Sequence, residues 1–130
     1  MAKLTVKRFS DLDEARVFYL GEADRKAEAE RSRYITPGNG QAMTYEAKHR
    51  EALEGDGPLL RAEADALEMT VAEVAASVLA ARAQWEEAGA QIEAARLKAK
   101  KQLRQAQTAS EMHAVVREMS RSLDNLAVQS

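Results

Sequence analysis

The chain has 130 residues, which is about the length of one domain with a modest hydrophobic core. Its 21 acidic and 19 basic residues nearly cancel, so no large field draws nucleic acid or an anionic membrane surface to it. Cysteine is absent, which excludes disulfides, thiolate nucleophiles and cysteine-ligated metal sites. Because the sequence has no run of about 18 uncharged apolar residues, we expect a soluble protein that remains in the cytoplasm.

The amino-terminal segment is expected to form an extended arm and one helix. Residues 3–9, KLTVKRF, alternate between apolar and polar side chains, which is typical of a short strand or arm that must dock on another surface. A helix is predicted over residues 12–33, since Asp13 and Glu14 suit the positive end of a helix. Its apolar stripe fades into charge after Gly21, so we expect the helix to project or to be covered by a partner.

A glycine-rich segment, YITPGNGQ at residues 34–41, is expected to separate two helices. Pro37 disfavours a helical conformation in the residue before it, while Gly38 and Gly40 tolerate positive φ, so we predict a turn or hinge at these three residues. A phosphate-binding loop would need a hydrophobic strand before the glycines and a lysine after them, whereas a charged helix precedes them here and QAMTYEAK follows. A second amphipathic helix is predicted over residues 42–53.

The clearest signal is a long helix predicted over about residues 70–106, after a short helix that begins at Pro58. Thr70 and Glu73 have the spacing of a capping box, which marks the start of a helix. Apolar or small residues then recur in steps of three and four, the heptad pattern of a coiled coil. This seam comprises Val71, Val74, Val78, Ala81, Trp85, Ala88, Ile92, Ala95 and Ala99, and it shifts register to Leu103 and Ala106.

The heptad seam is expected to be buried against other polypeptides, because an alanine-rich chain has few bulky residues with which to cover it. The predicted protein-interface residues are Val71, Val74, Val78, Trp85, Ile92 and Leu103. Trp85 is either a core anchor or an interface hot spot, and both interpretations bury it. A last helix follows the capping-box pattern TASE at residues 108–111, and we favour its folding back. We therefore predict an all-α helical bundle, divided into an arm and helix at 1–33 and a helical domain at 34–130.

No catalytic residue, metal ligand or cofactor site is predicted. Glu46 and His49 form an ExxH pair, half of a ferritin-like two-metal site, but no second pair accompanies it. A metal-binding helical bundle is therefore a less favoured alternative. The serines and histidines lie in no recognised nucleophile motif. The basic run RLKAKKQLRQ at residues 96–105 lacks interleaved aromatic residues, so a solvated helix face is favoured over a nucleic-acid contact.

Several of these residues together resemble a pattern found in small proteins, or in C-terminal segments of larger ones, encoded among the tail and tail-fibre genes of bacteriophages and prophages. The pattern runs as a Tyr-Ile-Thr, a Gly-x-Gly-Gln turn, a Tyr-x-x-Lys helix, a Pro-led helix, a tryptophan and an Ile-Glu-x-x-Arg. The matching positions are Tyr34, Ile35, Thr36, Gly38, Gly40, Gln41, Tyr45, Lys48, Pro58, Trp85, Ile92, Glu93 and Arg96. The resemblance covers roughly residues 34–106.

The resemblance implies a non-enzymatic structural protein of the tail or tail-fibre attachment region. Such a protein would be in the host cytoplasm during assembly and in the virion tail afterwards. Tail tips and fibres often have threefold symmetry, so we expect a homo-oligomer, a trimer ahead of a dimer, that contacts other phage tail or fibre proteins but neither nucleic acid nor membrane. The alternative is a tail or tail-fibre assembly chaperone that is not retained in the virion.

Overall fold

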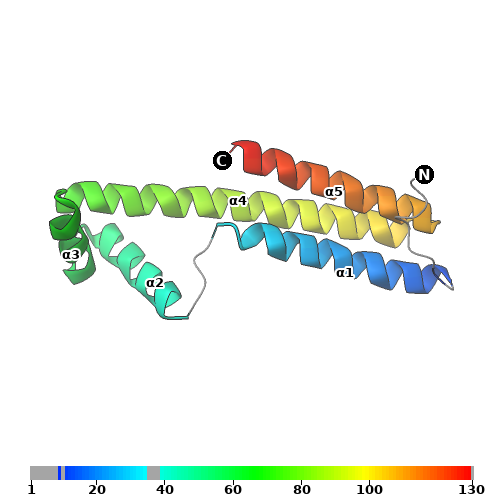
Figure 1. Cartoon of the computed structure of the whole chain (residues 1–130), viewed down its shortest axis with the longest axis horizontal. Coiled ribbons are helices and arrows are strands. Elements are labelled where there is room, and N and C mark those ends of the chain that lie inside the picture. The colour runs from blue at the N-terminus through cyan, green and yellow to red at the C-terminus, as the bar shows by residue number, and fades with distance from the viewer. Residues whose placement is uncertain (1–8, 10, 35–38, 130) are drawn as a thin grey trace. The chain divides into compact units, whose positions relative to one another are not determined.

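A computed structural model describes residues 9, 11–34 and 39–129, and these residues form helices and connections without any strand (Figure 1). The helices are α1 (Leu12–Arg31), α2 (Asn39–Glu54), α3 (Pro58–Leu67), α4 (Val71–Gln105) and α5 (Ala109–Gln129). The predicted all-α fold with one long helix is confirmed. The predicted strand or arm before residue 9 lies outside the described residues. No helix in the described ranges is long and apolar enough to span a bilayer.

The chain divides into two compact units, and helix α4 contributes to both. The terminal unit combines residues 1–33 with residues 88–130, and the central unit consists of residues 34–87. This division differs from the one expected from sequence, which kept residues 34–130 together. The reason is that α1 packs against α5 and is joined by ion pairs to the second part of α4, far along the chain.

The core of the terminal unit is built from helix faces with matched periodicity. Helix α1 presents a buried face with residues four positions apart, which are Ala15, Tyr19, Ala23 and Ala27, and the three alanines are completely buried. The larger buried side chains come from α4 and α5 with heptad spacing. The buried residues of this part of the chain are Ala88, Ile92, Ala99 and Leu103 on α4, Ala106 in the turn after it, and Met112, Val116, Met119 and Leu123 on α5. The expectation that α1 projects or needs a partner beyond Gly21 is therefore wrong, because alanines let it pack closely within its own chain.

Helix α5 folds back beside α4, which confirms the favoured reversal (Figure 1). The backbone N–H of Glu111 donates to the Thr108 hydroxyl at 3.1 Å, and that of Gln107 donates to the Glu111 carboxylate at 2.9 Å. At the other side of the turn, Nη1 of Arg16 donates to the carbonyl oxygens of Leu103, Arg104 and Ala106 at 2.6, 3.2 and 3.1 Å. A guanidinium from α1 thus satisfies carbonyls that the end of α4 leaves without helical partners.

The central unit has a small core where α2, α3 and the first turns of α4 meet. Its buried residues are Ala52, Leu60, Ala64, Val74 and Ala75, and Val71, Val78 and Leu79 pack against them. The predicted capping box begins α4, since the Glu73 N–H donates to the Thr70 hydroxyl at 3.0 Å and the Thr70 N–H donates to the Glu73 carboxylate at 2.9 Å. The hydrogen bond from the Thr70 backbone N–H to the carboxylate is the main reason why the Glu73 pKa lies below its usual range.

The turn predicted at Pro37, Gly38 and Gly40 is only partly described. Pro37 and Gly38 lie outside the described residues. Gly40 belongs to the first turn of α2, because this helix begins at Asn39 rather than at residue 42. The first N–H groups of a helix have no intrahelical partner, so glycine costs less there than in the interior. The expectation of a turn at Gly40 is therefore wrong.

Candidate functional site

The structure separates the predicted interface residues into two groups. Val74, Ile92 and Leu103 are buried by the chain's own helices, and Val71 and Val78 are half-buried beside the central core. Trp85 keeps 38% of its surface exposed, so the interpretation of Trp85 as a core anchor is wrong, and its burial at an interface stays a prediction. The central core covers α4 only as far as residue 79, which leaves the next two turns uncovered. Of the predicted interface set, Trp85 is the large side chain still available to another molecule.

Trp85 lies at an open cleft of about 420 Å³ within the central unit, which we call the aromatic cleft. Helices α2, α3 and α4 contribute its walls. It is lined by Tyr34, Ala42, Tyr45, Glu46, Lys48, His49, Glu63, Ser77, Val78, Ala81, Arg82 and Trp85. Three aromatic rings are therefore surrounded by charged and polar groups, a composition typical of ligand-binding and protein-binding surfaces.

Each cation of the aromatic cleft contacts both a carboxylate and a ring. Arg82 donates to Glu46 of α2 at 2.8 Å and to Glu86 of its own helix at 3.4 Å, and its guanidinium lies 5.7 Å from the Trp85 ring centroid. Lys48 donates to Glu63 at 2.7 Å and lies 5.4 Å from the Tyr45 ring centroid. The hydrogen bond to Glu46 raises the pKa of Arg82, so this group stays charged throughout the accessible pH range.

The ExxH pair of α2 lies at this cleft, but its two side chains have different environments. Glu46 is engaged by Arg82, and Nδ1 of His49 is buried without a hydrogen-bond partner among the described residues. Within the same described part of the chain, no three histidine, aspartate or glutamate side chains come together as a metal-binding group. Glu46 thus takes part in an ion pair between helices.

The residues that carry the phage resemblance fall into two places. Tyr34, Tyr45, Lys48 and Trp85 all line the aromatic cleft, although they span fifty-two positions of the chain. Ile92, Glu93 and Arg96 belong to the terminal unit, where Ile92 is buried. Ile35, Thr36 and Gly38 lie outside the described residues. Gln41 lies in the first turn of α2, and Pro58 is the first residue of α3.

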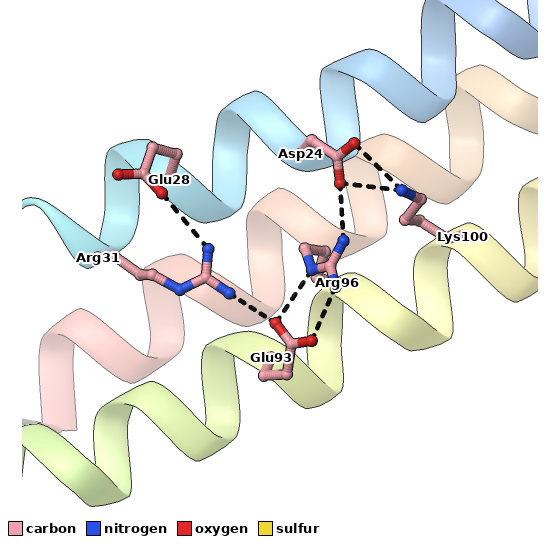
Figure 2. Close-up of polar contacts among 6 residues, drawn as sticks. All are labelled: Asp24, Glu28, Arg31, Glu93, Arg96 and Lys100. Carbon is pink, nitrogen blue, oxygen red and sulfur yellow. Dashed lines mark hydrogen bonds and ion pairs between the residues drawn. The ribbon is translucent and has the colours of Figure 1, made fainter.

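In the terminal unit, Glu93 and Arg96 form the centre of an ion-pair network between α1 and α4 (Figure 2). Arg96 donates to Glu93 at 2.8 Å and to Asp24 of α1 at 2.9 Å, and Lys100 reaches Asp24 at 3.1 Å. Arg31 of α1 donates to Glu93 at 2.6 Å. The hydrogen bonds from Arg96 lower the pKa values of Asp24 and Glu93, and the Arg96 pKa is raised in turn.

This network changes how the basic run at residues 96–105 is interpreted. Arg96 and Lys100 are used within the chain, so they do not belong to a free basic surface. Lys98, Lys101 and Arg104 are exposed on α4, and no described carboxylate pairs with their side chains. Two cations of the run therefore join α4 to α1, and the other three are exposed to solvent.

A second concave surface, of about 390 Å³, lies between α1 and α5. Tyr19 and His113 line it with ring centroids 6.1 Å apart in an edge-to-face arrangement, and burial raises the pKa of Tyr19. Lys26, Arg117, Glu22 and Asp124 also line it. Its charges are mixed, and the aromatic rings are mostly covered, so it offers less apolar surface than the aromatic cleft.

Comparisons of this chain with protein-family models, with curated proteins and with solved structures each find no match. The resemblance to phage tail-region proteins is therefore taken further only as a proposal.

Proposed function

We propose that the chain is a non-enzymatic structural protein of a bacteriophage or prophage tail, placed at the tail or tail-fibre attachment region. It acts through helix-mediated contacts with other tail or fibre proteins and with copies of itself. The observation that carries this proposal is the aromatic cleft, where Trp85 and Tyr45 remain 38% and 50% exposed. Large aromatic side chains that a fold leaves open are typical of protein-binding hot spots.

The positions of the resemblance residues support the same proposal. Tyr34, Tyr45, Lys48 and Trp85 come from separate parts of the sequence and share one open surface. A pattern that served only to specify the core would be expected at buried positions, whereas Tyr45 and Trp85 are exposed. Their shared location favours a binding role for the pattern.

Mass spectrometry of purified particles tests the structural role. Particles of the phage that encodes this chain would be separated from free protein by density-gradient centrifugation and then compared with the host lysate. We expect the chain to remain with the particles in a fixed ratio to the major tail protein. A chain found in lysate complexes with a tail or fibre protein but absent from particles would instead be an assembly chaperone. Absence of both associations would overturn the proposal.

A further inference from the structure

The two units carry opposite net charge, although the whole chain is nearly neutral. Residues 34–87 contain four lysines and arginines against ten aspartates and glutamates, a net charge of −6. In the terminal unit, the described residues 9, 11–33 and 88–129 contain twelve lysines and arginines against eleven aspartates and glutamates, a net charge of +1. The central unit of one copy and the terminal unit of another therefore attract each other, which favours their encounter.

The terminal unit has an exposed surface on α4 that combines positive charge with an apolar side chain. Leu97 is 52% exposed, and Lys101 and Arg104 follow it at intervals of four and three residues, so the three lie on one helix face. Lys98 is exposed beside Leu97. The described residues provide no carboxylate for any of the three cations. We call Leu97, Lys98, Lys101 and Arg104 the basic strip.

The aromatic cleft has the complementary features. Glu46 and Glu86 share the single cation of Arg82, so one of the two negative charges is not balanced by this group. Their side chains are 66% and 60% exposed, and such open ion pairs rearrange at little cost when another cation approaches. Trp85 offers an apolar surface beside these carboxylates. A helix that carries one leucine flanked by lysine and arginine matches this arrangement in both charge and polarity.

We propose that the basic strip of one copy docks in the aromatic cleft of a second copy. Leu97 contacts Trp85, while Lys101 and Arg104 pair with Glu46 and Glu86. This inference rests on the proposed role of the cleft as a protein-docking surface. Since the strip and Trp85 belong to one continuous helix, α4, the contact requires a second chain. Each docked copy still has one free strip or one free cleft, so assembly is head-to-tail and either closes into a ring or grows.

Two charge-reversal variants test this docking by complementation. The strip variant Lys101→Glu/Arg104→Glu lacks a functional strip but keeps its cleft. The cleft variant Glu46→Lys/Glu86→Lys lacks a functional cleft but keeps its strip. All of these residues are exposed or half-buried, and circular dichroism checks that both variants fold. In sedimentation velocity at low salt, we expect wild-type protein to associate and each variant alone to associate about a hundredfold more weakly.

The equimolar mixture of the two variants is the decisive sample. One intact strip and one intact cleft remain in the mixture, so we expect a heterodimer that grows no further and that dissociates when salt is added. A matched control, Lys26→Glu/Arg117→Glu, makes the same change in charge at the groove between α1 and α5, and should associate like wild type.

Several results would overturn the docking. One is a wild-type protein that stays monomeric, and another is a strip variant that associates as strongly as wild type. The others are a control variant that loses as much association as the strip variant does, and an equimolar variant mixture that stays monomeric. Retention of the wild-type protein on nucleic acid, lost in the strip variant without any change in self-association, would assign the strip to nucleic acid instead. None of these results depends on whether the chain is found in phage particles, so the proposed function fails or stands separately.

Discussion

Arg82 and Arg96 make equivalent contacts in the two units. Each guanidinium joins a carboxylate on its own helix to a carboxylate on another: Glu86 and Glu46 for Arg82, Glu93 and Asp24 for Arg96. Both arginines have raised pKa values, so their charge does not change over the accessible pH range. Any pH dependence of these contacts must therefore come from the carboxylates.

Replacing Asp24 tests the contact between α1 and α4. The Asp24 pKa is lower in the folded chain than its value of about 3.9 in an unfolded one, so its stabilising effect is complete above that value. The effect disappears as pH falls through the folded pKa. We expect Asp24→Asn to lower the free energy of unfolding at neutral pH by less than about 1 kcal/mol, because the side chain is half exposed. Urea denaturation at neutral pH and at stepwise lower pH measures this difference.

The matched control for Asp24→Asn is Glu118→Gln. Glu118 pairs with Arg121 one turn away on α5, and both side chains are about 60% exposed, so its removal should change stability less. A larger loss for Glu118→Gln than for Asp24→Asn, or a loss for Asp24→Asn that persists at the lowest pH, would contradict this account of the network.

At the scale of the element, the start of α4 depends on the Thr70 side chain. Its hydroxyl accepts the Glu73 N–H, which no backbone carbonyl of the helix can do. We expect Thr70→Ala to lower the free energy of unfolding by about 1 kcal/mol, and Ser122→Ala on the exposed face of α5 to leave it nearly unchanged. Urea denaturation of both variants compares them directly. Equal stability of the two variants would show that the capping box of Thr70 and Glu73 does not stabilise the fold.

Helix α1 depends instead on small side chains. Ala23 is completely buried, so a larger residue there must push α1 away from its neighbours. We expect Ala23→Met to lower the free energy of unfolding by about 1–3 kcal/mol. Ala29→Met makes the same change at an exposed position of the same helix and should have little effect. Chemical denaturation followed by circular dichroism measures both, and similar stability of the two variants would exclude close packing at Ala23.

These helices differ in how far their sequences predict them. The long helix could be predicted because Thr70, Glu73 and the heptad spacing are local signals within one segment. The packing of α1 could not, since it depends on Ala23 and on Asp24, whose partners lie more than seventy positions away. Alanine spaced by four among charged residues looks like a solvated face until the opposing helix is known.

The sequence likewise predicted some residues of the candidate site and missed others. The pattern singled out Trp85 as an interface residue, and the resemblance included Tyr45 and Lys48. Arg82 was missed, although its position three residues before Trp85 and four before Glu86 places it on the same helix face as both. The exposure of Trp85 could not be foreseen, because it follows from where the central core ends on α4.

At the scale of the whole molecule, the two units are expected to unfold at different denaturant concentrations. Trp85, the single tryptophan, reports on the central unit. Leu60→Ala in the central core and Leu103→Ala in the terminal core should each cost about 2–5 kcal/mol, since both side chains are fully buried. We expect the tryptophan fluorescence transition to shift strongly with Leu60→Ala and weakly with Leu103→Ala. Equal shifts would mean that the chain unfolds as one cooperative unit.

The contacts of Arg16 bear on the order in which the chain can fold during its synthesis. The carbonyls that this guanidinium binds come 87 to 90 positions later in the chain. Helix α1 leaves the ribosome first, but Arg16 cannot form these hydrogen bonds until α4 and the turn that follows it have also left the ribosome. The central unit is one uninterrupted stretch, residues 34–87, so it can become compact before the helices that pack against α1 have been synthesised. A pause in synthesis once residue 87 has left the ribosome would therefore give a nascent chain whose middle can fold while its first helix remains unattached.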